Sequence, residues 1–369
     1  VLVIDHYVPH FDKDAGSRST WLYLQLLVEM GYNVKFIGAN FFPHQPYTLA
    51  LQQAGIEVLV GERMARKLNQ WLREQAPDID AIYIHRPHIT EQFREILQEL
   101  KPRPRMIYFG HDLHYLRTER EAALRDDAGL LKEAASWRDR EFAVFSVMDH
   151  IYYPSQVEVD AILELRPELK VQAIPLYVYA SVEALPYVAA ERADMLFVGG
   201  FNHPPNADGL RWFVAEILPR LAAAGSNMKL HIVGSNMPDD IAKLAGARVV
   251  VHGFLSDREL AELYARVAVV VVPLRFGAGV KGKVIEALQH GLPIVTTSIG
   301  AEGLPNPAAV MQIADEANEF ATSLLKVEHA DAEILAQLDN YPDYFNKTFA
   351  NVLAAAIIAR DFGAPSLKP

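Results

Sequence analysis

Short apolar runs alternate with amphipathic stretches along the chain, and this alternation predicts the fold class. Residues 1–5 (VLVID) and 81–85 (AIYIH) have the length and unbroken hydrophobicity of buried parallel strands. The stretches between such runs carry apolar residues at helical spacing. This strand–helix order predicts a doubly wound α/β sheet. In the first half, the expected strands are residues 1–5, 33–38, 56–60, 81–85, 106–109, 150–153 and 171–174.

The helices expected in the first half lie between these strands. Ser17 or Ser19 is the expected N-cap of the first helix, and Gly31 is its expected end. Residues 117–147 are expected to form one long helix with a charged, solvated face. The other expected helices are residues 49–54, 64–75, 90–100 and 156–165.

The pattern lapses at residues 175–192 and then restarts, which predicts a linker between two domains. The expected domains are residues 1–178 and 190–340, and residues 341–369 are expected to form a C-terminal helix that packs back on the first domain. In the second half, Ser256 and Glu259 form an S-x-x-E capping box. Its expected strands are residues 195–198, 229–233, 248–252, 267–273, 293–297 and 309–313, and its other expected helices include residues 207–224, 317–327, 333–338 and 345–359.

Composition narrows the class of protein. The chain has 369 residues, of which 51% are hydrophobic and 22% charged, as in folded globular proteins. A formal net charge of −11 argues against a general nucleic-acid binder. The absence of cysteine excludes disulfides and thiolate chemistry and fits a reducing, cytoplasmic compartment. No apolar run approaches membrane-spanning length. Because the chain starts inside a strand, we expect it to come from a longer protein, and the alternatives for the part before Val1 are a targeting segment or a further domain.

The stretch of residues 273–304 (PLRFGAGVKGKVIEALQHGLPIVTTSIGAEGL) carries the clearest candidate chemistry. A glycine-rich loop opens the backbone around Lys281 just before a helix. The amino end of a helix favours an anion, because its N–H groups and its dipole point outward. Glu286 lies about a turn and a half further along. An anion site with a carboxylate behind it suits a nucleotide diphosphate with hydroxyl-bearing sugars, and the alternative for Lys281 is a solvated surface lysine.

Glycines at the ends of three strands extend this expected rim. Gly199-Gly200, Gly234 and Gly253 each follow a strand of the second half. Since ligands bind outside the carboxyl ends of parallel strands, these ends are expected to face one crevice. In the first half, Gly16 has two interpretations, close approach to a ligand or a plain turn.

The first half offers a second candidate group in Gly110 to Leu116 (GHDLHYL), directly after a predicted strand. His111 or Asp112 is expected to be catalytic or to orient an acceptor, because of this position. The alternative is a surface histidine beside Asp112 as a helix cap. A metal site from His111 and His114 would lack a third ligand nearby, so no metal is predicted.

The motif GAGVKGKVIEALQHGLPIVTT resembles that of GT-B glycosyltransferases of family 4, the glycosyl transferases group 1. FVGGFNHPPNADGLRWF resembles the first strand and loop of the donor domain in that family. VHGFLSDRELAELY resembles the segment that cradles the nucleotide base, and GAEGL fits one branch of the family. The resemblance covers most of the second half and, more loosely, the first strand, loop and helix of the chain.

This resemblance implies two Rossmann-like domains facing across a cleft, with the acceptor on the first domain and the nucleotide sugar on the second. It implies transfer of a hexosyl or deoxyhexosyl group to a glycan or glycolipid, in polysaccharide or cell-envelope synthesis. It further implies retention of anomeric configuration, without a metal or other cofactor. Glu286 corresponds to the family glutamate that holds the donor ribose. The other expected donor-binding residues are Gly16, Gly200, Asn202, Asn206, Gly253, Phe254, Gly279, Val280, Lys281 and Gly282.

The chain departs from the family pattern at two places. Ala278 occupies the position of the first glutamate of the E-x7-E motif. The Arg and Lys that follow the first donor-domain strand are replaced by Asn202, His203 and Asn206. Lys281 is therefore the expected cation for the leaving phosphate, and Lys283 is a second candidate. The expected catalytic residues are His111, Asp112 and Lys281.

Two other functions compete with sugar transfer. A dinucleotide-dependent oxidoreductase would need a G-x-G-x-x-G fingerprint, which neither glycine loop provides. A non-catalytic module that binds a nucleotide sugar in an assembly complex is the stronger alternative, because of Ala278. The cluster of Lys101, Arg103 and Arg105 has two interpretations, peripheral contact with the inner face of a membrane or ordinary solvated surface.

Overall fold

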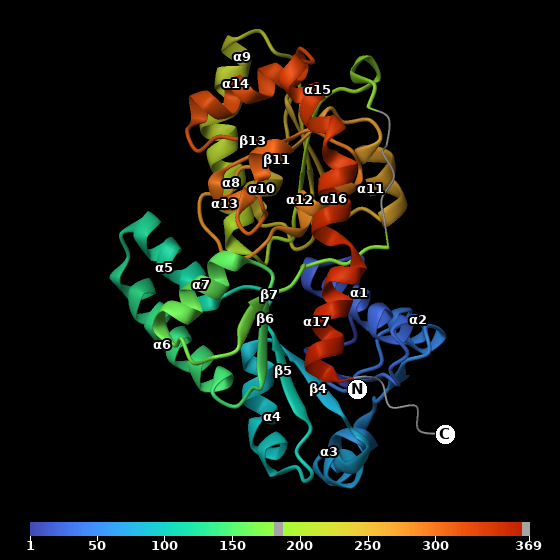
Figure 1. Cartoon of the computed structure of the whole chain (residues 1–369). Helices are drawn as coiled ribbons and strands as arrows, with labels where there is room; N and C mark the ends of the chain where they lie inside the picture. Colours follow the sequence, from blue (N-terminus) through green and yellow to red (C-terminus); the bar gives the residue numbers. More distant parts are fainter. Residues whose placement is uncertain (181–186, 364–369) are drawn as a thin grey trace. The chain divides into compact units, whose positions relative to one another are not determined.

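The structure, a computed structural model, describes residues 1–180 and 187–363. The chain forms two compact units. Unit 1 comprises residues 1–11, 16–180 and 349–369, and unit 2 comprises residues 12–15 and 181–348. Each unit is built around a parallel sheet flanked by helices (Figure 1). Residues 181–186 of the expected linker and residues 364–369 of the expected C-terminal segment lie outside the described residues.

Unit 1 contains a seven-stranded sheet in the order β3-β2-β1-β4-β5-β6-β7. Every neighbouring pair is parallel, so the expected doubly wound sheet is confirmed. Tyr83, Tyr108 and Phe109 of its central strands are fully buried, as the unbroken apolar runs predicted. The strands are β1 (Leu2–Asp5), β2 (Lys35–Gly38), β3 (Glu57–Val58), β4 (Ala81–His85), β5 (Arg105–Phe109), β6 (His150–Tyr153) and β7 (Val171–Ala173).

The first helix of unit 1 begins earlier than expected. α1 starts at Ala15, so Ser17 and Ser19 lie inside its first turns and neither is its N-cap. Ser19 instead donates its hydroxyl to the carbonyl of Leu176 at 2.7 Å, a long-range contact that the local sequence does not reveal. The other helices are α2 (Tyr47–Gln53), α3 (Glu62–Gln75) with a 3-10 turn η1 (Ala76–Asp78), α4 (Pro87–Glu99), α5 (His114–Arg125), α6 (Ala128–Phe145), α7 (Gln156–Leu165) and α17 (Asn351–Phe362).

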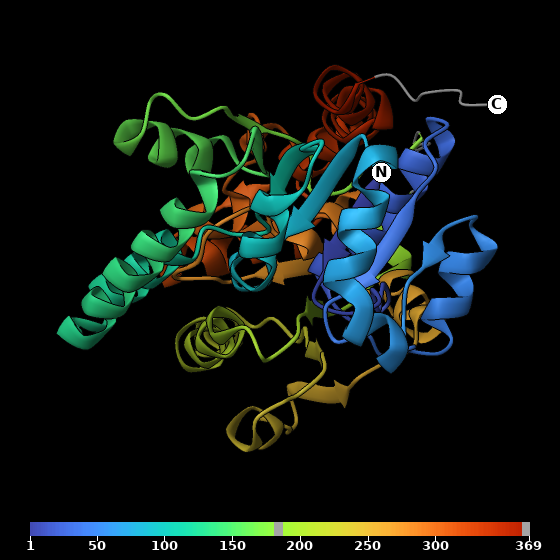
Figure 2. The ribbon, with the colours of Figure 1, turned by 90° about the horizontal axis from the view of Figure 1, so that it is seen from below.

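The single long helix expected over residues 117–147 is wrong, because the chain reverses between α5 and α6. Asp126 adopts a left-handed conformation with φ 52°, which ends α5. The side chain of Asp127 then accepts hydrogen bonds from the amides of Gly129 and Leu130 and caps α6. The two helices lie side by side (Figures 1 and 2). The left-handed conformation of Asp126 together with the capping side chain of Asp127 explains the break.

Unit 2 contains a six-stranded parallel sheet in the order β10-β9-β8-β11-β12-β13. This is the strand order of a Rossmann-type sheet. The apolar run of residues 267–273 forms β11, whose four residues are all buried. The strands are β8 (Met195–Val198), β9 (Leu230–Val233), β10 (Val249–Gly253), β11 (Val269–Val272), β12 (Ile294–Thr296) and β13 (Gln312–Ile313).

Most helices of unit 2 lie where the periodicity predicted, and the Ser256–Glu259 capping box is present. The helix expected over 207–224 contains a π-helical turn, in which the amide of Leu218 bonds to the carbonyl of Phe213. Pro219 follows, and because proline lacks an N–H, the wider turn accommodates it. The helices and short turns are η2 (Ala189–Glu191), α8 (Pro204–Trp212), η3 (Phe213–Ile217), α9 (Leu218–Ala223), α10 (Asp239–Ala242), α11 (Asp257–Tyr264), α12 (Gly282–Gln289), α13 (Ser298–Ala301), η4 (Pro307–Ala309), α14 (Ala317–Glu328), α15 (Ala332–Asp339) and α16 (Tyr341–Phe349).

The single helix expected over residues 345–359 is also wrong, because α16 and α17 are separated at Ala350. The backbone of Tyr179 bonds on both sides of this break. Its amide donates to Phe349 at 2.9 Å, and its carbonyl accepts from Asn351 at 2.8 Å. This pairing between distant segments replaces helical hydrogen bonds and starts a new helix on unit 1.

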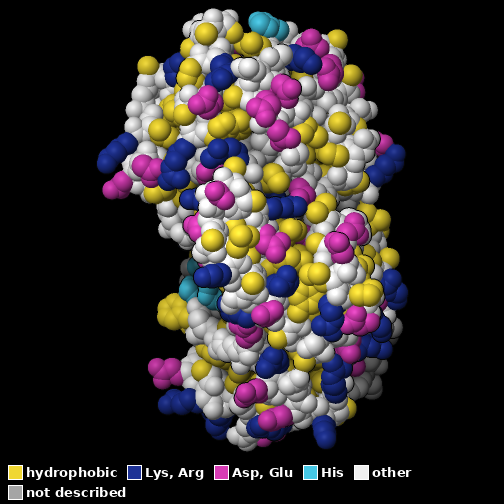
Figure 3. Space-filling view, turned by 90° about the vertical axis from the view of Figure 1, so that its left-hand side faces the viewer, with side chains coloured by type: hydrophobic (Ala, Val, Ile, Leu, Met, Phe, Trp, Pro, Cys, Tyr) yellow, Lys and Arg dark blue, Asp and Glu magenta, His cyan; other side chains and the backbone are white. Residues whose placement is uncertain are grey.

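The surface seen in Figure 3 mixes cations and anions without a large patch of either sign. Two members of the expected basic cluster are engaged within unit 1. Arg103 Nη1 donates to both carboxylate oxygens of Asp149, at 2.9 and 2.7 Å, and Arg105 donates to the carbonyl of Phe362. Within the described part of the chain, no helix combines the length and hydrophobicity needed to span a membrane.

Asp361 joins α17 to the sheet of unit 1, and its removal should loosen that helix. Its carboxylate is buried and accepts hydrogen bonds from Tyr152 Oη at 2.7 Å and Gln172 Nε2 at 3.1 Å. We expect Asp361→Ala to lower the free energy of unfolding by about 2 kcal/mol, because the Tyr152 hydroxyl loses its partner. Urea unfolding followed by circular dichroism measures this.

The matched control is Asp343→Ala, which removes an exposed ion pair with Lys347 on α16. It should change the free energy by less than about 0.5 kcal/mol. Equal stability of the two variants would contradict the anchoring role of Asp361.

Candidate functional site

The first candidate site lies where β8 and β11 end in unit 2. β8 pairs with β9 on one side and with β11 on the other, so the chain crosses over in opposite directions from this strand. The loops after β8 and β11 therefore diverge, and such a switch point opens a crevice at the carboxyl edge of a sheet. Most of the expected donor-binding residues lie on these two loops and on the start of α12.

The loop before α12 folds back on the side chain of Lys281. Gly277 and Gly279 have φ values of 146° and 73°, a backbone conformation that favours glycine. Lys281 is the N-cap residue of α12 and is only 7% exposed, so it does not stand at an exposed helix end as expected. Its ammonium group donates to the carbonyls of Ala278, at 3.0 Å, and Gly279. Lys281 therefore holds the loop closed and satisfies carbonyls that would otherwise lack partners.

Lys283, two residues further along, connects the two loops. Its Nζ donates to Oδ1 of Asn206 at 2.6 Å and lies 4.2 Å from the centre of the Phe197 ring. A Cβ atom on Gly199 would come within 2.8 Å of this Nζ. Burial and, next, the charge of Lys281 lower the pKa of Lys283 to about 7, and the carboxylate of Glu286 opposes this shift.

Glu286 lies one turn after Lys283 on the same face of α12. The hydroxyl of Tyr264 lies 3.5 Å from its Oε2. Tyr264 in turn stacks on His290, with ring centres 4.2 Å apart and planes inclined by 13°. This stacked pair, which the sequence reasoning missed, forms a wall beside the carboxylate. A partly buried carboxylate in such a setting can accept hydrogen bonds from sugar hydroxyls.

The glycine after β9, Gly234, has a steric reason. A Cβ atom on Gly234 would lie 2.0 Å from the carbonyl oxygen of Gly199, so no side chain fits there. The amide of Gly234 donates to the carbonyl of Gly253 at 2.8 Å. The rim over β8, β9 and β10 is thus backbone packed on backbone. Beyond it, the side chain of Phe254 is 49% exposed, and Asn202 is also exposed.

Unit 1 has an equivalent switch point between β1 and β4, occupied by Asp5. This buried carboxylate accepts from Arg86 Nε at 2.8 Å and from the amide of His6 at 2.7 Å through Oδ1. Its Oδ2 accepts from the hydroxyl of Thr20 at 2.8 Å. Burial acts to raise the pKa of Asp5, but the Arg86 guanidinium and the other donors outweigh it and hold the pKa well below its ordinary value.

The expected catalytic residue His111 joins this cluster through His85. Nδ1 of His85 and Nε2 of His111 are 3.2 Å apart. Burial lowers the pKa of His85 to about 4 and that of His111 well below its ordinary value, so both imidazoles are neutral at neutral pH. Among the described residues, Nε2 of His85 and Nδ1 of His111 are buried without a hydrogen-bond partner. Both ring nitrogens of His111 are therefore buried, Nε2 beside His85 and Nδ1 without a hydrogen-bond partner among the described residues.

Asp5, His85 and His111 are also residue types that can bind a metal ion. One possible ligand atom from each lies within 4.8 Å of those from the other two. The arrangement suits a hydrogen-bonded cluster better than a cation. Both oxygens of Asp5 already accept hydrogen bonds, and the guanidinium of Arg86 would repel a metal ion placed beside them. His114 is not part of this group, because its Nδ1 faces Glu141 at 3.2 Å.

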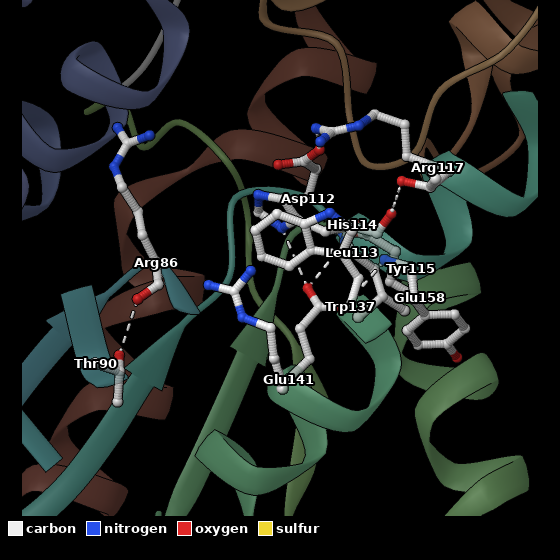
Figure 4. A network of polar contacts seen from close by, with 12 residues as sticks. Arg86, Thr90, Asp112, Leu113, His114, Tyr115, Arg117, Trp137, Glu141 and Glu158 are labelled. Carbon is white, nitrogen blue, oxygen red and sulfur yellow. Dashed lines mark hydrogen bonds and ion pairs between the residues drawn. The ribbon is translucent and has the colours of Figure 1, made fainter. Parts of the chain in front are cut away.

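The loop that carries His111 and Asp112 is held by two buried carboxylates (Figure 4). Glu158 of α7 accepts from the amide of Leu113 at 2.6 Å. Glu141 of α6 accepts from the amides of His114 and Tyr115 at 2.9 and 3.1 Å. Asp112 pairs with Arg117 and is not the cap of α5. Glu141 and Glu158 were missed because in sequence they resemble ordinary charged positions on helix surfaces.

The sequence reasoning also missed Asp5, Thr20, His85 and Arg86. The carboxyl-edge rule that selected His111 applies equally to Asp5 and His85, which end β1 and β4. Gly16 lies in the first turn of α1, where its carbonyl accepts from the Thr20 hydroxyl at 3.1 Å. Gly16 thus contributes a backbone acceptor to this cluster, and its expected approach to a ligand stays a prediction.

The neutral state of His85 predicts a pH dependence of stability. Its pKa is about 4 in the folded protein against an ordinary value of 6.5, so over this interval the unfolded chain binds a proton that the folded chain does not. The free energy of unfolding should therefore have its highest value above about pH 6.5 and should fall as the pH approaches 4. The contribution of this one group is on the order of 3 kcal/mol.

Urea unfolding at about pH 7.5 and about pH 4.5 measures this effect, with His85→Gln compared to wild type. The variant should lose less stability than wild type between the two pH values. His329→Gln, at an exposed position, is the matched control and should follow wild type. The same loss in wild type and His85→Gln would contradict a neutral buried His85.

Comparison with known proteins is consistent with this geometry. Residues 192–329, which contain β8 to β13, match the family described as Glycosyl transferases group 1. An "Uncharacterized 44.6 kDa protein in cps region" of Klebsiella pneumoniae is 30% identical over 140 residues. That match covers 36% of this chain and 36% of the relative.

Several solved structures share the fold over nearly the whole chain. Sucrose-phosphate synthase from Thermosynechococcus elongatus superposes with a TM-score of 0.72 at 18% identity, covering 99% of both chains. HepE from Anabaena, in complex with UDP-glucose, gives a TM-score of 0.67 at 17% identity over 97% of this chain and 98% of its own. OtsA gives 0.66 at 13% identity over 100% and 99%. The chain therefore has a GT-B fold of two Rossmann-like units, and its second unit carries the stretch that matches the glycosyltransferase family.

Proposed function

We propose that the protein is a glycosyltransferase that moves a sugar from a nucleotide-diphosphate sugar to an acceptor. The observation that carries this proposal is the start of α12. There the helix N-terminus, the ammonium of Lys283 and the carboxylate of Glu286 lie together at the switch point of unit 2. The first two suit a diphosphate, and the third suits a ribose. The family match of residues 192–329 and the GT-B neighbours support the same assignment.

The chemistry requires stabilisation of the leaving group. As the bond to the sugar breaks, negative charge builds up on the β-phosphate and the sugar becomes oxocarbenium-like. Lys283 and the N-terminal amides of α12 stabilise that charge. Lys281 keeps the loop in place for this purpose through its bonds to Ala278 and Gly279. The two lysines thus divide the role for which the sequence indicated Lys281 first and Lys283 as a second candidate.

The finer features of the reaction follow from the resemblance to family 4. We infer a retaining, metal-independent transfer, with attack on the same face and the leaving phosphate accepting the acceptor proton. Two residues of unit 1, the neutral His111 and the adjacent Asp112, are assigned to the handling of the acceptor. Because both nitrogens of His111 are buried, it would have to turn its ring to contact a ligand directly.

The substrates are proposed by class. HepE was solved with UDP-glucose, which makes uridine nucleotides the first donors to test. Phe254, with an exposed ring next to the glycine rim, is assigned to the base. The proposed acceptor is a glycan or glycolipid of polysaccharide or cell-envelope synthesis, and the proposed location is the cytoplasm, with peripheral contact to the inner face of the membrane.

A non-catalytic module that binds nucleotide sugars is the second candidate. Ala278 favours it, because this position is 4% exposed and brings no carboxylate to the sugar. The module and the enzyme share the same donor site, so binding alone does not separate them. Turnover does.

Purified protein should release free nucleotide from at least one of UDP-, GDP- or dTDP-sugars in the presence of an acceptor. We expect Lys281→Ala to lower this rate by about 100-fold, because the loop that carries the phosphate-binding amides opens. Glu286→Gln should weaken nucleotide binding by about tenfold, because it loses a charged hydrogen-bond acceptor. A coupled assay of nucleotide release measures the rate, and calorimetry measures the affinity.

The control is Lys347→Ala, at an exposed position on α16, which should leave rate and affinity unchanged. Full activity of Lys281→Ala would contradict the role of this loop. Tight nucleotide binding without turnover for any donor and acceptor pair would support the module instead.

A further inference from the structure

The ammonium group of Lys283 occupies an unusual electrostatic position. Its hydrogen-bond partner among the described residues is the neutral amide of Asn206, on α8, rather than a carboxylate. The ring of Phe197, from β8, lies beneath it at 4.2 Å and is fully buried. Removing an ammonium from water without a counter-charge is unfavourable. The surroundings therefore favour the neutral amine while the site is empty.

Among the described residues, the charged groups that shift the pKa of Lys283 come from its own segment. Lys281 lies two residues before it and adds a like charge. Glu286 lies one turn after it and attracts the ammonium, but its carboxylate also has the hydroxyl of Tyr264 3.5 Å away. β8 and α8 contribute Phe197 and Asn206, neither of which is charged. The charges that act on Lys283 are thus one lysine and one carboxylate, so no net negative charge from them balances its ammonium.

Asn206 fixes where the head of Lys283 lies. Its Nδ2 donates to the carbonyl of Gly200 at 2.7 Å, so its Oδ1 must be the atom that faces Lys283. The residue is only 4% exposed, and both ends of its amide are occupied. The sequence reasoning expected Asn206 to contact the donor. These contacts instead indicate that it acts through Lys283. It is a positioning residue.

We propose that binding of a nucleotide-diphosphate sugar is coupled to the uptake of one proton by Lys283, which Asn206 holds in place for the diphosphate. This inference rests on the proposed function. The diphosphate brings the negative charge that the empty site lacks, and the protonated amine becomes its partner. At any pH at which Lys283 is neutral in the free protein, Lys283 takes up one proton from the solvent for each donor molecule that binds.

The sign of the pH dependence follows directly. The pKa of Lys283 in the empty site is about 7. Below this pH the amine is already protonated, and binding takes up no proton. Above it, the affinity for the donor falls by up to tenfold for each unit of pH, because one proton must be bound with the ligand. A surface lysine would produce no such dependence near neutrality.

Isothermal titration calorimetry with UDP-glucose tests this coupling. The diphosphate of a nucleotide sugar has no ionisation near neutral pH, so uptake reports on the protein. At about pH 8.5, titrations in buffers of different ionisation enthalpy should give an uptake of about one proton, and at about pH 6 close to none. The dissociation constant should rise about tenfold from pH 7.5 to 8.5. If UDP-glucose does not bind, GDP-mannose and dTDP-glucose replace it as probes.

Variants assign the proton to one residue. Lys283→Arg keeps a permanent charge, so its binding should show no uptake and little dependence on pH. Lys283→Gln should bind about 100-fold more weakly at pH 6 and also show no uptake. Asn206→Asp gives Lys283 a carboxylate partner, which should keep it protonated, abolish the uptake and weaken binding. Lys347→Gln is the control and should keep the wild-type uptake. Circular dichroism confirms that each variant is folded.

The outcomes separate this inference from the proposed function. Donor binding without proton uptake at pH 8.5 would overturn the coupling and leave sugar transfer standing. Uptake that persists in Lys283→Gln and disappears in Lys281→Gln would assign the proton to the other lysine and overturn the role of Lys283. Failure of all three nucleotide sugars to bind would overturn the proposed function itself.

Discussion

The parallel pairing of the first strand of each sheet determines where chemistry can occur in this protein. β1 pairs with β2 and β4, and β8 pairs with β9 and β11, so each is flanked by parallel strands reached in opposite directions. The loops that follow such a strand must separate, and they leave backbone amides and helix N-termini facing one edge. The Asp5 cluster and the Lys283 site both lie at such an edge. The two units thus present the same architectural opening with different side chains.

The two openings treat charge in opposite ways. In unit 1, the carboxylate of Asp5 is matched by Arg86, and the adjacent imidazoles of His85 and His111 are neutral. That network is balanced and does not require a charged ligand. In unit 2, the charges that act on Lys283 are one lysine and one carboxylate, beside a helix N-terminus. A polar site that is short of negative charge is a receptor for an anion. This difference supports the proposed assignment of the nucleotide to unit 2 and of the acceptor to unit 1.

The sequence predicted what depends on local pattern. The thirteen strands of the described residues were all expected from apolar runs, and the signal is clearest for the central strands, which are buried on both faces. The breaks at Asp126 and Ala350 were missed for different reasons. The first depends on competition between side-chain caps and helix propagation, and the second on hydrogen bonds to the distant Tyr179. Periodicity reports which face of a helix is apolar and does not report either effect.

The candidate sites show the same limit. The glycines and lysines of the α12 loop were predicted from the sequence, because the motif is local. The residues that each lysine side chain contacts were not predicted. Lys281 turns back to the carbonyls of its own loop, whereas Lys283 reaches Asn206, 77 residues earlier in the chain. The partners of His111 were missed because Asp5 and His85 come from other strands. Residues at the carboxyl ends of neighbouring strands should therefore be read as one group, even when they are far apart in sequence.

On the proposed function, the substitution at position 278 alters how the donor is recognised. Ala278 is buried, and its carbonyl is bound by Lys281, so this part of the loop contributes backbone structure and no carboxylate. The remaining polar groups of the site address the diphosphate and the pentose, which UDP-, GDP- and dTDP-sugars have in common. Discrimination among sugars requires differences in binding that these common groups do not supply. The choice of sugar must therefore depend on groups outside the α12 loop, and changes within that loop should alter affinity for all donors together.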